Sequence, residues 1–151
     1  MAYPEDRAHA TGPFGSYRRD KKIEFTGAAG LGLAGSPVPL FTVTGSVWVH
    51  VVGFCTENLA ESGATATISV GISTDTAGLI AVTNGVNIDN GEVWFDGTPA
   101  AMEVLAGWGG AFIAGGNDII GTVAAANVTD GTLTFVCFWT PLSSDGLVVA
   151  S

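Results

Sequence analysis

The chain has 151 residues and a formal net charge of −9; 47% of its residues are hydrophobic and 13% are charged. This length allows one domain with a sizeable core and excludes two ordinary domains. Nucleic acids and anionic membranes would repel so acidic a chain, so we exclude both as partners of its main body.

Neither a secretory signal nor a membrane segment is visible. The opening MAYPEDRAHA is polar, and no run reaches the ~18 apolar residues that a membrane span needs. The two cysteines, Cys55 and Cys137, are too few for a disulfide scaffold. We expect two buried thiols, with a bridge between them as the alternative, in a protein made and assembled in a reducing cytoplasm.

The basic residues are gathered at one end of the chain. Residues 1–22 carry five cations against three anions, and residues 23–151 carry eleven anions and no cation. The five cations are Arg7, Arg18, Arg19, Lys21 and Lys22. A body without cations cannot form side-chain salt bridges of its own, so we expect packing, hydrogen bonds and neighbouring subunits to hold it.

The first 38 residues are predicted to lie outside the compact domain. Residues 1 to about 22 show no apolar periodicity, which indicates an extended arm with little structure of its own. Residues 25–40 are rich in glycine and other small residues, and we expect a flexible connection that becomes ordered only against another surface. The boundaries predicted are therefore 1–38 for the arm and linker and 39–151 for the folded domain.

Period-two alternation predicts β-strands in the rest of the chain. In FTVTGSVWVHVVGFC, Val47, Val49 and Val51 share one face, and Trp48 and His50 share the other. The stretches ATATISVGIS and GTLTFVCFWTPL alternate in the same way. Their threonine-rich outer faces suit a pleated sheet, because β-branched residues pack well there.

Shorter strands are expected between turn signals such as TNG, DNG, FDGTP, AGGND and TDG. We place these strands at residues 79–82, 92–95, 111–114 and 118–123, and a weak helix at residues 100–105. This spacing predicts an all-β protein, a β-sandwich of about seven or eight strands of jelly-roll or immunoglobulin-like type.

No catalytic motif stands out. HExxH, CxxC, GxSxG and a glycine-rich phosphate loop are all absent. His50 and Cys55 lie five residues apart on one predicted strand, so they point to opposite faces and make a poor nucleophile pair. A carboxylate pair for glycoside hydrolysis stays open, since its distances in space are unknown. We expect no enzyme, no catalytic residue and no cofactor.

Calcium is the metal to weigh, because many acidic residues lie in predicted turns. None of them matches the pattern D-x-[DN]-x-[DN]-G, and turn stereochemistry alone accounts for DNG and TDG. We therefore expect no metal ligand.

The tryptophans divide between core and surface. Trp139 shares its face with Leu133 and Phe135, which places it in the core. Trp48 and His50, on one strand face, and Trp108, in the glycine-rich AGWGGAF, are candidates for a subunit interface, where Trp is enriched. Stacking on a sugar ring is the alternative role.

The arm mixes cations with apolar anchors, which favours a docking segment over a solvated tail. We expect it to contact a partner through Tyr17, Arg18, Arg19, Lys21, Lys22, Ile23 and Phe25.

The blocks PLFTVTGSVWVHVVGFCTENL, GATATISVGISTDTAGLI and CFWTPLSSDGLVVAS, with the lead-in YRRDKKIEFTGAAGLGLAG, resemble small virion structural proteins of tailed bacteriophages. The resemblance covers most of the chain and consists of strands rich in Gly, Ala, Thr and Val, few charges and an extended arm. It implies a capsid decoration (cement) protein without catalytic residues: a β-sandwich, often trimeric, whose arm lies over the major capsid protein or another virion protein.

Two alternatives remain beside capsid decoration. One is a carbohydrate- or receptor-binding β-sandwich of a phage tail or fibre, and the other is a different oligomeric tail or baseplate component. In all three cases the protein would reside in the virion after assembly in the host cytoplasm.

Overall fold

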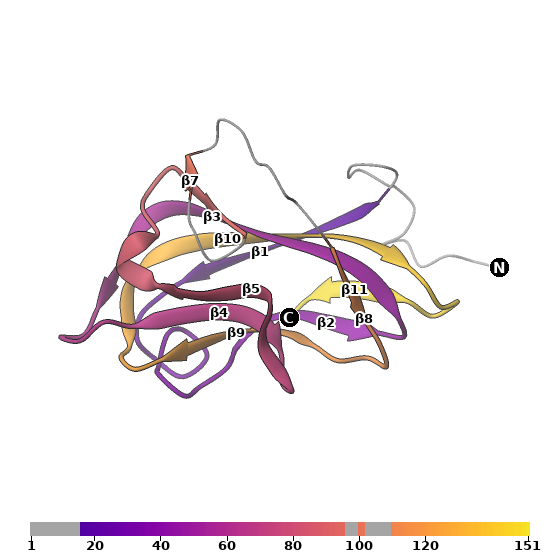
Figure 1. The fold of residues 1–151 in the computed structure, drawn as a ribbon, viewed down its shortest axis with the longest axis horizontal. Coiled ribbons are helices and arrows are strands. Elements are labelled where there is room, and N and C mark those ends of the chain that lie inside the picture. Colours follow the sequence, from indigo (N-terminus) through magenta and orange to yellow (C-terminus); the bar gives the residue numbers. More distant parts are fainter. Residues whose placement is uncertain (1–15, 96–99, 102–109) are drawn as a thin grey trace.

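The computed structural model describes residues 16–95, 100–101 and 110–151, which form two antiparallel β-sheets packed face to face (Figure 1). The first sheet contains, in spatial order, β1 (Tyr17–Glu24), β10 (Val128–Pro141), β3 (Val47–Glu61), β6 (Glu92–Trp94) and β7 (Ala100–Ala101), and β8 (Ala111–Ile113) also pairs with β3. The second sheet contains β11 (Leu147–Ala150), β2 (Val38–Thr44), β9 (Ile119–Ala124), β4 (Thr67–Ile72) and β5 (Asp75–Asn84).

The expected all-β sandwich is therefore confirmed. Eleven strands are present among the described residues, more than the number expected. The strands that were not expected are β7, which is only two residues long, and β1 and β11, which lie at sheet edges. A single-turn 3-10 helix, Gly85–Asn87, follows β5.

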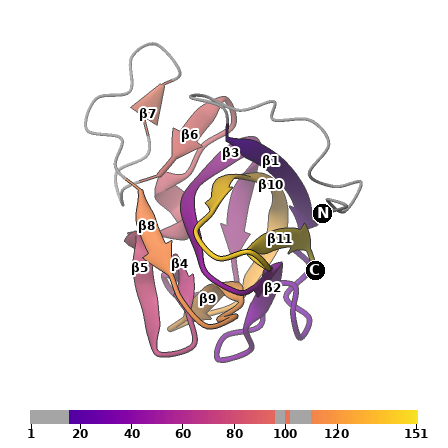
Figure 2. The same ribbon diagram turned by 90° about the vertical axis from the view of Figure 1, so that its right-hand side faces the viewer.

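The long antiparallel pair of β3 and β10 forms the middle of the first sheet (Figure 2). It runs from Val47 opposite Pro141 to Glu61 opposite Val128. Side chains alternate along it as the sequence predicts, because successive residues of a strand face opposite sides. Val47, Val49 and Val51 face the core and are buried, while Trp48 is exposed.

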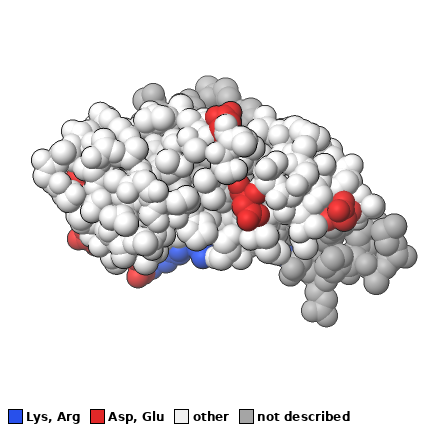
Figure 3. Space-filling view, turned by 90° about the horizontal axis from the view of Figure 1, so that it is seen from below, with Lys and Arg blue, Asp and Glu red and all other residues white. Residues whose placement is uncertain are grey.

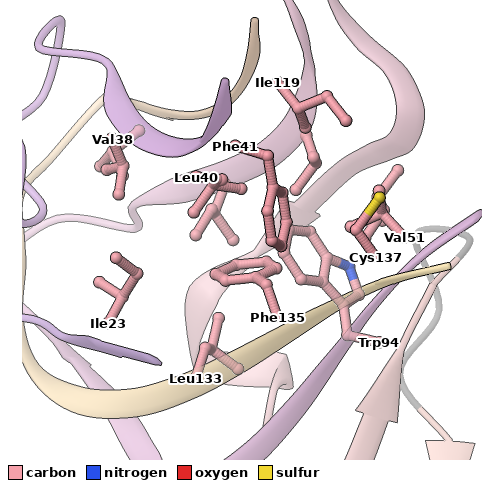
Figure 4. Close-up of a cluster of buried hydrophobic side chains, with 14 of the residues drawn as sticks. Ile23, Val38, Leu40, Phe41, Val51, Trp94, Ile119, Leu133, Phe135 and Cys137 are labelled. Carbon is pink, nitrogen blue, oxygen red and sulfur yellow. The ribbon is translucent and has the colours of Figure 1, made fainter. Parts of the chain in front are cut away.

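The core lies between the two sheets and is filled by aliphatic and aromatic side chains (Figure 4). The ring of Trp94, on β6, meets that of Phe135, on β10, edge to face, with centroids 6.2 Å apart. The indole Nε1 of Trp94 donates a hydrogen bond of 2.9 Å to Oγ1 of Thr83, on β5. This buried bond links the first sheet to the second.

Residues 17–24 depart from the expected flexible arm: they form the edge strand β1, paired with β10 along its whole length. Ile23 and Phe25 are each only 3% exposed and belong to the core. The apolar alternation that predicts a strand is absent here, because two of the inward positions are Arg19 and Lys21. Long basic side chains can bury their aliphatic stems while their charged ends stay in water.

The glycine-rich residues that follow β1 are also ordered, and they lie against the turn between β9 and β10. The backbone N–H of Val128 donates to the carbonyl oxygen of Gly32 at 2.9 Å. Gly32 has φ +109°, and a Cβ there would lie 2.2 Å from the carbonyl oxygen of Val128, so only glycine fits. The expected boundary at residue 39 is therefore not found: the described chain from Ser16 onward belongs to one sandwich.

Two local expectations differ from the structure. Of the helix expected at residues 100–105, Ala100 and Ala101 form strand β7, and the rest lies outside the described residues. The TDG sequence at 129–131 is not a chain reversal but an irregularity inside β10, where the register against β3 shifts. Gly131 has φ +105° there, which suits glycine in a β-bulge.

Candidate interaction surface

The basic residues of the described chain line the outer edge of the first sheet. Figure 3 shows Lys and Arg gathered in one place, with an acidic side chain directly beside them and others scattered over that face. Even-numbered positions of β1 point away from the core: Arg18, Asp20, Lys22 and Glu24. The four exposed side chains thus alternate in charge along the strand.

Neighbouring charges on this strand are paired. Nη2 of Arg18 lies 2.7 Å from Oδ2 of Asp20, and Nζ of Lys22 binds Oε1 of Glu24. The hydrogen bond to Asp20 raises the pKa of Arg18, and the hydrogen bond from Lys22 lowers the pKa of Glu24. Both pairs are exposed, so each adds little to stability.

The inward cations of β1, Arg19 and Lys21, donate hydrogen bonds to backbone carbonyl oxygens. Nζ of Lys21 donates to the backbone carbonyl oxygen of Ser151, just after β11 of the second sheet. The guanidinium of Arg19 donates to the carbonyl oxygen of Arg18 at 3.4 Å. Lys21 thus joins the two sheets at this edge.

Next to the charged strand, the outer face of β10 and β3 carries no charge. Residues 46–56 and 132–141 contain no Asp, Glu, Lys or Arg. In the register of the sheet, Arg18 lies beside Phe138, and Phe138 lies beside His50. Val52 and Val136 form the next cross-strand pair and are buried. An aromatic and aliphatic face therefore borders the basic edge directly.

The exposed part of this face centres on Trp48 and Phe112. These residues are cross-strand partners on β3 and β8, and they are 38% and 61% exposed. The Trp48 ring also meets that of His50 edge on, with centroids 5.0 Å apart. We call the set Trp48, His50, Phe112 and Phe138 the aromatic face.

The position of Trp48 depends on a glycine. A Cβ at Gly110 would lie 2.0 Å from Cζ2 of Trp48, so the indole lies directly against the backbone there. Any other residue at Gly110 would displace this ring. The pKa of His50 is lowered because burial disfavours the charged imidazolium.

Open depressions occur elsewhere, at the edge of the second sheet. One is lined by Glu61, Gly63, Ala64, Thr65 and Val86. A second lies between the β4–β5 hairpin and β8, beside Asp75, Leu79 and Phe112. Each is lined by one carboxylate, Glu61 or Asp75, and neither contains a histidine, a cysteine or a cation.

Two of the acidic residues weighed for calcium accept hydrogen bonds from backbone N–H groups. Asp118 accepts a hydrogen bond from the N–H of Val43 at 3.0 Å, and Glu92 accepts one from the N–H of Asp89 at 2.9 Å. Within the described ranges, no three His, Cys, Asp or Glu side chains lie close enough together to hold a metal ion.

The two cysteines are free and buried. Cys55 lies opposite Leu133 and Cys137 lies opposite Val51, so the two thiols are four residues apart along the β3–β10 pair. That separation is about 13 Å, well beyond the ~7 Å that a disulfide can span. Burial raises the pKa of both thiols.

The candidate site residues from the sequence thus fall into four groups. Trp48 and His50 lie together on the aromatic face, whereas Trp108 lies outside the described residues. Of the seven residues expected to dock on a partner, Tyr17, Ile23 and Phe25 are engaged in the fold of their own domain. The remaining four, Arg18, Arg19, Lys21 and Lys22, lie along the edge strand β1.

Phe112 was not singled out from the sequence. The signal was weak, because β8 is only three residues long and shows a single alternation between exposed Phe112 and buried Ile113.

Comparisons with protein-family models, with curated proteins and with solved structures found no match. In the part of the chain that is described, no helix has the length and hydrophobicity to cross a membrane.

Proposed function

We propose that this protein is a non-enzymatic virion structural protein that decorates and stabilises a phage capsid. The observation that carries the proposal is the uncharged aromatic face, with Trp48 and Phe112 exposed at its centre. A second support is the resemblance of the sequence to small virion proteins of tailed phages. The proposed partner is the major capsid protein or another protein of the shell.

The aromatic face suits a permanent contact with another protein. Protein interfaces are depleted of charge at their core and enriched in aromatic residues, which supply large contact areas at low entropic cost. Accessible outward residues of β3 and β10 are Trp, His, Phe and Thr, whereas a solvated sheet face normally carries Lys and Glu. Such a face would dock flat on a shell.

A decoration protein acts through many identical contacts. Each copy binds weakly, and repetition over a symmetric shell converts weak contacts into firm attachment. Copies that bridge subunit boundaries resist the separation of those subunits under internal pressure. The acidic body would be repelled by the packaged nucleic acid, which keeps it on the outside of the shell.

This proposal assigns docking to a sheet face rather than to a flexible arm. Ile23 and Phe25 are buried in the sandwich, so they cannot reach a shell without unfolding β1. The basic residues of β1 contribute at most a charged border to the docking surface.

One alternative function has an observation in its favour. Trp48 and Phe112 are adjacent exposed rings, and a sugar ring can stack on such a surface. The protein would then be a carbohydrate- or receptor-binding module of a phage tail or fibre.

Co-sedimentation separates these functions. The purified protein is mixed with empty heads, and separately with isolated tails, of the phage that encodes it, and it is also titrated with a panel of glycans. Saturable binding to heads, with raised head stability on heating, is the expected result. Binding to tails or to a glycan, without binding to heads, would replace decoration by the alternative.

A further inference from the structure

We propose that two copies of this chain pair through their β1 strands, antiparallel across a two-fold axis, so that their first sheets join into one. This inference goes beyond the proposed function and does not depend on it, because it concerns contact between copies rather than contact with a shell.

β1 is the regular open edge of the molecule. It is the last strand of its sheet, and its eight residues pair with β10 without a register shift. No described strand lies on its other side. An open edge of this kind presents backbone donors and acceptors that a second strand can use.

The other outer strands of the described chain suit such pairing less well. β7 and β8 are only two and three residues long. β11 is only four residues long. β5 is irregular: Val70 lies opposite Ile80, while Ile72 lies opposite Asp75. Five steps along β5 therefore match two steps along β4. Bulges of this kind twist an edge and disrupt its ladder.

The exposed charges of β1 are self-complementary. In chain order they are positive, negative, positive and negative, at Arg18, Asp20, Lys22 and Glu24. A second copy running in the opposite direction presents the reverse order. Arg18 then faces Glu24 of the second copy, and Asp20 faces Lys22 of the second copy. Each charge of this outward row meets an opposite charge, and opposite charges on directly facing strand positions stabilise a sheet.

Only one full-length register achieves this match. Facing residues must lie on the same side of the sheet, so the register can shift only in steps of two. A shift in one direction sets Arg18 against Lys22, and a shift in the other sets Asp20 against Glu24. Both place like charges together, which is unfavourable. The charges of an edge strand commonly disfavour pairing, and here they disfavour the shifted antiparallel registers of a second copy while they favour the two-fold one.

On the inward side, the proposed pairing would place two like charges opposite each other, and a hydrogen bond within each copy draws them apart. On the axis, Lys21 of each copy would face Lys21 of the other. However, its ammonium group binds the carbonyl oxygen of Ser151 in the second sheet of its own copy. This hydrogen bond draws the charge away from the axis and toward the other sheet.

Charge reversal provides the test. In Arg18→Glu, position 18 would face Glu24 of the second copy, so like charges meet twice in the dimer. In Glu24→Arg the same happens with two arginines. In a mixture of the two variants, both contacts join opposite charges. We expect the unmodified protein to be a dimer by sedimentation velocity at low salt, each variant alone to be a monomer, and the equimolar mixture to recover the dimer.

Two controls make the test decisive. Asp89→Arg makes the same charge change as Glu24→Arg at an exposed position away from β1, and it should remain dimeric. Near-ultraviolet circular dichroism of the buried tryptophans verifies that each variant is folded, and recovery on mixing cannot come from unfolded chains. A monomeric or trimeric unmodified protein, a dimer that neither variant disrupts, or a failure to recover on mixing would overturn the proposal. Binding to heads can succeed or fail in any of these cases, so the two proposals are tested separately.

Discussion

The ring of Tyr17 stacks on the indole of Trp139, with centroids 4.8 Å apart and an angle of 29° between the planes. The two residues are partners across β1 and β10. Because Trp139 is fully buried, this contact joins the first described strand to the core. The basic segment is therefore an element of the sandwich, and its cations lie where an edge strand needs solvent-exposed charge.

Trypsin tests this placement of the basic residues. Every Lys and Arg lies between Arg7 and Lys22. Proteases cut extended, mobile chain, so bonds within a paired strand are protected. We expect the bonds after Arg18, Arg19, Lys21 and Lys22 to survive in the free protein under conditions that digest an unfolded control. Mass spectrometry of the product reports each cut. Rapid cleavage at these four sites would mean that β1 does not hold to β10 in solution.

Trp139 is expected to be essential for stability. Trp139→Ala should lower the free energy of unfolding by ~3–5 kcal/mol, as large core truncations do. Trp48→Ala is the matched control, because Trp48 is 38% exposed and its loss should cost under ~1 kcal/mol. Urea denaturation measures both. Similar losses at the two positions would show that the core and the surface have been assigned incorrectly.

A milder change at Trp139 adds a second expectation. Its Nε1 is buried and has no hydrogen-bond partner among the described residues. Trp139→Phe removes this unpaired donor and keeps an aromatic ring, so it should cost clearly less than Trp139→Ala.

Strands with one apolar, buried side could be predicted from the sequence, whereas the edge strand β1 could not. Val47, Val49 and Val51 alternate with polar or aromatic residues, and this period of two appears only when one side of a strand is buried. In β1 the inward positions include Arg19 and Lys21, so the apolar alternation is absent.

The candidate site was also predictable in part. The position of Trp48 on an outer face followed from its parity. Its neighbour Phe112 lies on another strand, and their contact is set by the pairing of β8 with β3, more than sixty residues apart in the chain. No local pattern carries that information. The charged row of β1 is visible in the sequence, but its meaning depends on knowing that the strand is an edge.

The hydrogen bond between the sheets gives a further prediction. Thr83→Val removes the acceptor of the Trp94 indole and leaves a buried donor unpaired, which should cost about 1–3 kcal/mol. Thr83→Ser keeps the hydroxyl and is the control. Urea denaturation should therefore show a larger loss in the free energy of unfolding for Thr83→Val than for Thr83→Ser. The opposite order would indicate that the methyl group of Thr83, rather than its hydroxyl, matters.

His50 makes stability depend on pH. Burial lowers its pKa in the folded chain, whereas in the unfolded chain the pKa is the ordinary ~6.5. Between these two values the unfolded chain binds more protons, so the free energy of unfolding falls as the pH decreases below ~6.5. Above that pH both states are neutral and the contribution is fully present.

Denaturation at about pH 7.5 and about pH 5.5 measures this dependence. His50→Gln should reduce the difference in the free energy of unfolding between the two pH values. His9→Gln, the variant at the only other histidine of the sequence, should leave that difference unchanged. An equal decrease with and without His50 would assign the effect to other groups.

The central claim is that the aromatic face docks on a phage shell, and paired variants test it most directly. Trp48→Ser with Phe112→Ser removes the two exposed rings of the first sheet. Val82→Ser with Val86→Ser removes two comparably exposed apolar side chains, 60% and 53% exposed, on β5 and the turn that follows it. Binding of both variants to empty heads is measured by co-sedimentation after circular dichroism has verified their fold. The account predicts that the first variant binds roughly tenfold or more weakly and that the second binds like the unmodified protein. Equal binding by both variants would contradict it.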